Sequence, residues 1–181
     1  ANRLSAAIEV VSAVQRHGRF LPAALALCNE IATRWRLERA ALGVLRGRYV
    51  QLRALSHTES FSRKTRLSVA IEAAMEESLD QYLEVRWPAP PEATWIDRAH
   101  RELGTDHGPT AVASFPLRSD GEPRAVFLVE RVREQPLADD EVASLRERVE
   151  GGRSLTPLQV NALNRIVSSH AIQIQNYGEL K

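Results

Sequence analysis

The apolar positions of the chain recur with two different periods, and these periods predict its helices and strands. Helical spacing, with apolar residues three or four positions apart, predicts one group of segments. These predicted helices cover residues 4–15, 20–35, 67–83, 94–103, 137–149 and 155–181. Alternation with a period of two, or a short continuous apolar run, predicts another group. These predicted strands cover residues 40–45, 49–54, 110–117 and 124–132.

Short turns join these strands into two hairpins. The first turn is Arg46-Gly47-Arg48, and the second contains Asp120-Gly121. The strand at 124–132 is apolar at consecutive positions, so we expect it to be buried on both faces. The sequence therefore predicts an α+β domain built on a central mixed, mainly antiparallel sheet. We expect the N- and C-terminal helices on one face of this sheet and loops plus a helix on the other.

Two irregular segments separate the central helix from the second hairpin. Residues 87–91 form a proline-rich break, and residues 104–109 form a loop. Another polar loop, at 56–65, follows the first hairpin, and we expect both loops to border one small pocket. The domain boundaries that we expect follow from this order of segments. They are an N-terminal helix at 1–19, a domain at 20–177 with an inserted helix at about 134–152, and the end of the last helix at 178–181.

Composition excludes several classes of function. The chain has 24 Lys and Arg residues against 23 Asp and Glu, which argues against a dedicated nucleic-acid-binding protein. Cys28 is the single cysteine, so an internal disulfide and a cysteine-based zinc site are excluded. The apolar runs are too short to cross a bilayer, and no signal peptide is recognisable. We therefore expect a cytoplasmic segment that does not insert directly into a membrane.

The order of predicted elements resembles that of a GAF domain, a sensor fold related to PAS. Three regions carry this resemblance: 25–44, where a helix runs into the first strand, the closing hairpin at 110–130, and the exit helix from Leu155 to Tyr177. A narrower resemblance, carried by 54–58 and 74–81, is to the GAF units of bacterial membrane-fusion (HlyD-type) efflux adaptor proteins. The resemblance implies a regulatory or sensor module in signal transduction, with small-molecule binding. The predicted terminal helices have apolar faces that must pack on the sheet, on each other or on a second copy, and we expect a homodimer formed by these helices.

Several side chains in or near the predicted pocket are candidates for ligand contact. A histidine in a loop donates or accepts hydrogen bonds near neutral pH, which favours His57 and His107. Alternatively, His57 caps the end of its strand. No pair of these groups has the spacing of a metal site, so we expect no metal. The complete set of candidates is Ser56, His57, Arg63, Glu77, Trp87, His107 and Ser114.

The remaining candidates each have a functional and a structural interpretation. Glu77 lies nearer the apolar stripe of its helix than Glu76 and Asp80, which we expect on a solvated face; it could line the pocket or pair with Arg63 or Arg66. Trp87 could stack on a planar ligand or anchor a loop. Ser114 could face the pocket or be a small core residue.

Signatures of catalysis are missing from the sequence. It contains no nucleophile elbow, phosphate-binding loop or dinucleotide fingerprint. Cys28 lies on an apolar helix face without an activating neighbour, so we interpret it as a core residue. We therefore expect a module without enzymatic activity or cofactor, which binds an unidentified small ligand or relays a signal through its terminal helices. The alternative is a ligand-free dimerisation or docking module of a larger membrane-fusion-type protein.

Overall fold

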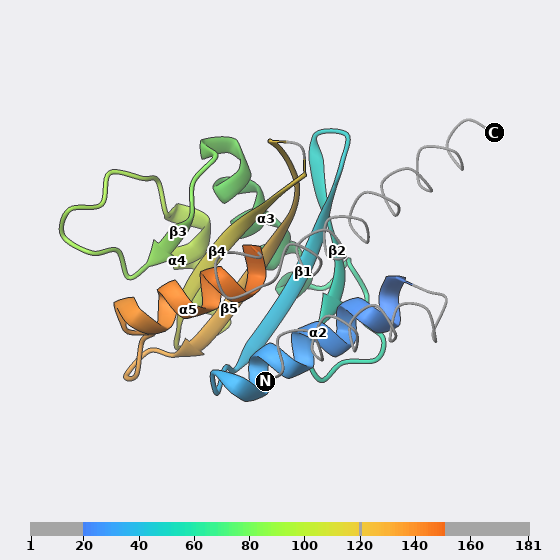
Figure 1. The fold of residues 1–181 in the computed structure, drawn as a ribbon, viewed down its shortest axis with the longest axis horizontal. Coiled ribbons are helices and arrows are strands. Elements are labelled where there is room, and N and C mark those ends of the chain that lie inside the picture. Colours follow the sequence, from blue (N-terminus) through green and yellow to red (C-terminus); the bar gives the residue numbers. More distant parts are fainter. Residues whose placement is uncertain (1–19, 120, 151–181) are drawn as a thin grey trace, which may run out of the picture.

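Residues 20–119 and 121–150 are described by the computed structural model of the chain. The predicted helices at 4–15 and 155–181 and the boundaries at 1–19 and 178–181 lie outside these residues. The elements, drawn in Figure 1, are α2 (Phe20–Arg34), β1 (Arg39–Arg46), β2 (Tyr49–Leu55), α3 (Arg66–Gln81), β3 (Val85–Trp87), α4 (Arg98–Asp106), β4 (Thr110–Ser119), β5 (Glu122–Val132) and α5 (Asp139–Glu150).

The strands form one five-stranded sheet in the order β2-β1-β5-β4-β3. All of its pairings are antiparallel. β5 is the central strand and alternates its side chains between two apolar layers, with Phe127 facing one and Leu128 the other. Both predicted hairpins are present, and the α+β fold class is confirmed.

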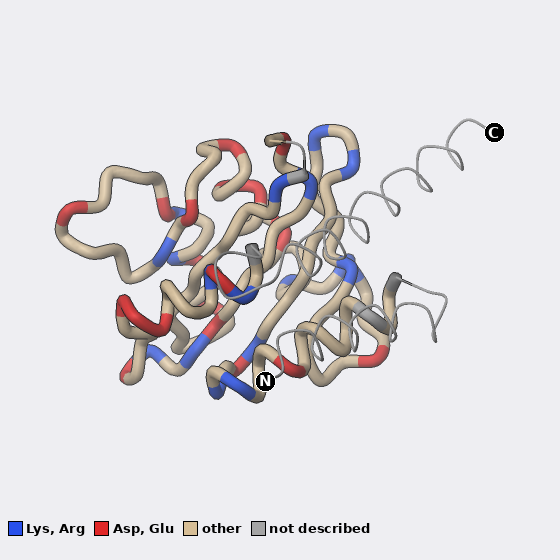
Figure 2. The backbone as a smooth tube through the Cα atoms, in the orientation of Figure 1, with Lys and Arg blue, Asp and Glu red and all other residues tan. Residues whose placement is uncertain are grey.

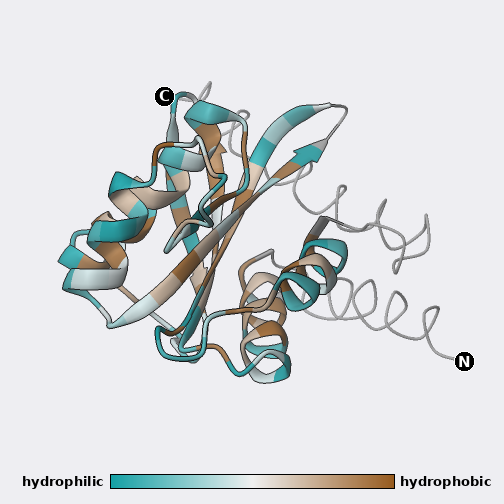
Figure 3. Ribbon diagram, turned by 90° about the vertical axis from the view of Figure 1, so that its left-hand side faces the viewer, coloured by the Kyte–Doolittle hydropathy of each residue, from teal (hydrophilic) through white to brown (hydrophobic). Residues whose placement is uncertain are grey.

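Helices cover both faces of the sheet, as Figures 1 and 3 show. α2 and α5 pack on one face, where Cys28, Ile31 and Leu145 lie against strand residues such as Phe127. α3 and α4 pack on the other face. The core that they share with the sheet contains Ala41, Val50, Leu52, Leu55, Ile71, Ala74, Met75, Leu79, Leu103, Val112, Val126 and Leu128. Within the described residues, no helix has the length and apolar character needed to cross a membrane.

Two predicted element boundaries were wrong. α4 begins at Arg98, and it continues through Gly104 to Asp106. Gly104 is therefore not a helix end. It is a position of close packing inside the helix, where an added Cβ would lie 2.6 Å from the Thr110 carbonyl oxygen and 2.7 Å from the Trp87 ring. The short strand β3, which pairs with β4, lies directly before the proline-rich break and was not predicted.

Candidate functional site

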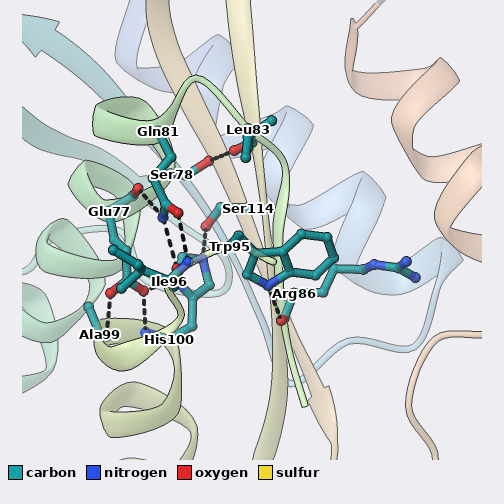
Figure 4. A network of polar contacts seen from close by, with 10 residues as sticks. All are labelled: Glu77, Ser78, Gln81, Leu83, Arg86, Trp95, Ile96, Ala99, His100 and Ser114. Atoms are coloured by element: carbon teal, nitrogen blue, oxygen red, sulfur yellow. Dashed lines mark hydrogen bonds and ion pairs between the residues drawn. The ribbon is translucent and has the colours of Figure 1, made fainter. Parts of the chain in front are cut away.

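His100, on α4, connects helix α3 to strand β4 of the sheet, and its side chain is completely buried. Its Nδ1 lies 2.8 Å from Glu77 Oε1 on α3, and its Nε2 lies 2.8 Å from Ser114 Oγ on β4 (Figure 4). An ionised carboxylate only accepts hydrogen bonds, so Nδ1 carries a proton. In the neutral ring Nε2 accepts from the Ser114 hydroxyl, and in the protonated ring it donates to Ser114. The contacts are therefore satisfied in either state.

Glu77 also caps the N-terminus of α4. Its Oε2 accepts from the Ala99 N–H at 2.8 Å, and its Oε1 accepts from the His100 N–H at 3.1 Å. Asp97, at the N-cap position, makes no capping bond with its own side chain. Burial raises the pKa of Glu77, but the hydrogen bonds from the His100 ring and from the two backbone N–H groups outweigh it, so the net pKa is lowered. Glu77 is therefore held in its charged form.

The loop before α4 is hydrogen-bonded to α3 and β3 close to the Glu77 contacts. Gln81 Nε2 donates to the Ile96 carbonyl oxygen at 2.8 Å, and Gln81 Oε1 accepts from the Ile96 N–H at 2.7 Å. The Trp95 indole N–H donates to the Arg86 carbonyl oxygen at 3.1 Å. Because these bonds adjoin those of Glu77, the loop and α4 are held to α3 along two successive turns (Figure 4).

A second buried polar cluster lies at the end of the sheet near the C-terminus of α4. Arg39 binds both carboxylate oxygens of Glu130, at 2.5 and 2.7 Å, and Glu130 is completely buried. Thr110 Oγ1 donates to the same carboxylate at 2.8 Å. Arg39 also donates to the backbone carbonyl oxygen of His107 at 2.6 Å. The two-point contact with Glu130 orients Arg39, and the single bond from Arg39 to His107 holds the loop after α4 against the sheet.

The candidates in the two predicted loops, Ser56, His57 and His107, make structural hydrogen bonds through their backbone or a buried hydroxyl group. Ser56 is buried, and its Oγ accepts from the Ala40 N–H at 2.9 Å. His57 has an exposed side chain and a left-handed backbone with φ of 58°, and its N–H donates to Asn29 Oδ1 at 2.7 Å. His107 acts through its backbone carbonyl oxygen in the Arg39 contact.

Two further candidates have partners that were not predicted. Arg63 pairs with Glu72 at 2.7 Å, so the suggested pairing of Glu77 with Arg63 or Arg66 is replaced by the contact with His100. Trp87 lies against Gly104 on α4 and under the guanidinium group of Arg133, 4.7 Å from its ring centre. Glu76 was expected on a solvated face; instead its Oε1 accepts from the Val50 N–H of β2 at 2.9 Å.

The structure thus brings Glu77 and Ser114 together through His100, which was not among the candidates. The available signal was that His100 lies one helical turn before Leu103, so both belong to the buried face of α4. In the described part of the chain, no group of three or more His, Cys, Asp or Glu side chains is arranged to hold a metal ion.

Comparison with known proteins identifies the fold. No protein-family model matches the chain, and no curated protein matches it in sequence. A GAF domain of an Acinetobacter phosphoenolpyruvate-protein phosphotransferase matches with a TM-score of 0.57 and 11% identity, covering 97% of this chain and 98% of that chain. A phycocyanobilin-bound GAF domain from a cyanobacterial phytochrome matches with a TM-score of 0.57 and 12% identity, covering 97% of each chain.

A third similar structure is an enzyme. The free methionine-R-sulfoxide reductase of Neisseria meningitidis, in complex with its substrate, has a TM-score of 0.56 and 11% identity, and the match covers 93% of this chain and 89% of that chain. At such low identity the likeness establishes the fold and not the activity. The chain has the fold of a GAF domain.

Proposed function

We propose that the chain is a non-catalytic regulatory or sensor module, in which a small ligand acts on the contacts of His100 with Glu77 and Ser114. The observation that carries this proposal is the buried hydrogen-bonded chain from α3 through α4 to β4. His100 is completely buried in this state and connects a helix pair to the sheet. A ligand that competes for its bonds therefore binds a state in which α4 has moved away, and its binding would shift the population toward that state.

The fold supports this assignment because two of the similar structures hold small molecules. One is a GAF domain with phycocyanobilin bound, and the other is a sulfoxide reductase in complex with its substrate. Polar groups that converge in an otherwise apolar region also supply the orientation and specificity of a small-molecule site. In this chain Glu77, His100 and Ser114 lie in such a region.

Catalysis through Ser114 is disfavoured although its contacts resemble a nucleophile, base and acid in series. Ser114 and His100 are both completely buried, so a substrate has no access to the hydroxyl group in this state. We expect a fluorophosphonate probe to leave the folded chain unlabelled. Labelling of Ser114 at a rate above that of the unfolded chain would contradict a non-catalytic role.

Thiol chemistry is disfavoured as well. Cys28 is completely buried, and burial raises the pKa of its thiol to about 12. A thiolate is the reactive form of cysteine, and at this pKa it is scarcely populated near neutral pH. We therefore propose that the chain does not share the reductase activity of its Neisseria neighbour.

A ligand-free scaffold is the second candidate, and one packing observation favours it. Met75 is completely buried and contacts Gly43 so closely that an added Cβ on this glycine would overlap its sulfur. Met75 therefore fills space between α3 and the sheet. Such a scaffold could serve a larger protein of the membrane-fusion type, as the narrower sequence resemblance implies.

The two candidates differ in their response to small molecules. We expect a thermal-shift screen of metabolites against the full chain to yield compounds that raise its melting temperature, and His100→Gln to abolish that effect. Arg98→Ala, which removes an exposed arginine from the same helix, is the matched control. If the chain is a ligand-free scaffold, no compound will raise its melting temperature. If a compound still stabilises the His100→Gln variant, its binding site lies elsewhere in the chain.

We also propose that two copies of the chain pair through the terminal segments 1–19 and 155–181. The support is the apolar stripe of their sequences, which needs a partner surface. Light scattering of the full chain should give the mass of two chains. A single-chain mass at the highest soluble concentration would exclude the homodimer.

A further inference from the structure

A half-open cavity of about 390 Å³ lies between the C-terminal end of α3 and strand β4. Its lining comes from the segment after α3 and from β4, and consists of Tyr82, Glu84, Pro116 and Arg118. Small-molecule pockets commonly measure about 300–1,000 Å³. The cavity therefore has room for a small organic molecule, and its opening gives that molecule access from solvent.

Arg118 supplies an unbalanced positive charge to this cavity. The residue is exposed, and its Nη2 donates to the Tyr82 carbonyl oxygen at 3.3 Å. No carboxylate in the described part of the chain pairs with it. The Glu84 carboxylate is already balanced, because Arg146 binds its two oxygens at 2.6 and 2.9 Å. The charges that line the cavity thus favour an anionic ligand.

Tyr82 presents an aromatic ring at the same cavity from an unfavourable backbone conformation. It follows the last turn of α3 with a left-handed backbone and φ of 56°. Glycine is the usual residue at such a helix end, because a Cβ is strained there. Tyr82 is also 58% exposed, so its ring gains little from burial. Neither helix capping nor core packing accounts for a tyrosine at this position, whereas contact with a ligand does.

We propose that this cavity binds an aromatic carboxylate, with its carboxylate on Arg118 and its ring against Tyr82 and Pro116. A guanidinium group recognises a carboxylate at two points. Aromatic rings attract one another in offset or edge-to-face arrangements. Because Arg118 already contacts the backbone of Tyr82, one small ligand can reach both side chains. This site goes beyond the proposed function, since His100 does not line the cavity.

The test is a titration of the full chain with benzoate, followed by ligand-observed NMR at an ionic strength held constant with chloride. We expect saturable binding. Benzamide keeps the ring and loses the charge, and acetate keeps the charge and loses the ring. Each should bind at least about tenfold more weakly than benzoate. Equal binding of either compound, or no saturable binding of benzoate, would overturn the proposal.

Variants of the two recognising side chains locate the binding. Arg118→Gln should weaken benzoate binding about tenfold or more, because it removes the charged partner. Arg124→Gln, which removes an exposed arginine from the neighbouring strand β5, is the matched control and should bind as the wild type does. Tyr82→Gly should also weaken binding while its melting temperature is kept or raised, since glycine adopts the left-handed backbone without strain. Full affinity in Arg118→Gln or in Tyr82→Gly would contradict the assignment.

His100→Gln separates this cavity from the site of the proposed function. We expect this variant to bind benzoate with the affinity of the wild type, because its side chain does not line the cavity. Loss of benzoate binding in His100→Gln would place the aromatic acid at the contacts of His100 and overturn its assignment to the cavity.

Discussion

The carboxylate of Glu77 performs the capping role that Asp97 does not perform for α4. Three donors surround it: the His100 ring and the backbone N–H groups of Ala99 and His100. A carboxylate near the first turn of a helix is also favoured by the helix dipole. One side chain of α3 therefore determines where α4 begins.

Glu77→Gln should destabilise the chain by about 1–3 kcal/mol, because the amide weakens charge-assisted bonds and places donors against donors. The sign of the pH dependence follows from the lowered pKa of Glu77. Its contribution is fully present above the ordinary value of 4.5 and is lost as the pH falls from there through the folded pKa. Urea denaturation at several pH values should show the difference between wild type and variant narrowing in that window.

Glu102→Gln is the matched control for this measurement, because Glu102 is exposed and pairs only with Arg98 one turn away in the described structure. Exposed pairs of this kind contribute a few tenths of a kcal/mol. If Glu77→Gln is no more destabilising than Glu102→Gln, the capping role assigned to Glu77 is wrong.

Gly43 and Met75 occupy complementary space between β1 and α3. Gly43→Ala should cost about 1–3 kcal/mol, because its Cβ would also lie 2.5 Å from Val50 Cγ1. Met75→Ala should cost about 2–5 kcal/mol through the cavity that it leaves. Denaturation of the double variant measures the coupling: we expect a cost smaller than the sum of the single costs. Strict additivity would mean that the contact between the two residues contributes no coupling energy, contrary to this account.

At the scale of elements, α3 protects the exposed edge of the sheet. The Val50 and Leu52 N–H groups of β2 are bound by Glu76 and Glu72. Unpaired edge groups are a template for pairing with another chain, and carboxylates that occupy them prevent it. Glu72 and Glu76, on the acidic face of α3, thus stabilise the edge of the sheet.

Glu76→Ala should cost about 1 kcal/mol and increase concentration-dependent association, because the Val50 N–H loses its acceptor. Light scattering across a concentration series measures this association. Glu76→Gln keeps an acceptor oxygen at the same place and should behave as the wild type does. Equal association of both variants would attribute the effect to charge and not to the strand edge.

The elements show what sequence patterns can predict here. Long segments with a clear apolar pattern were predicted, α3 from its helical period and β5 from its continuous apolar run, because burial determines which positions are apolar. β3 has only three residues, too few for a period to emerge. Gly104 was interpreted as a helix end, although its small size is needed for contact with Trp87. Local sequence does not contain that tertiary reason.

At the scale of the whole molecule, the fold was predictable and the site only in part. Glu77 and Ser114 were candidates because they are polar residues on apolar faces. Their connection required His100, whose position depends on how α4 crosses α3 and the sheet. His57 was favoured for its place in a loop, but its side chain is exposed and its backbone makes the contact. Sequence patterns predict faces of elements and not which faces meet.

Our central proposal is that a change in the Glu77–His100–Ser114 contacts is relayed through α4 to the rest of the chain. Amide hydrogen exchange of the full chain, wild type against Glu77→Gln, tests it most directly. The account predicts faster exchange in residues 98–106 and also in residues 155–181, with β5 unchanged. Faster exchange confined to residues 98–106, with residues 155–181 unaffected, would contradict a relay from this site.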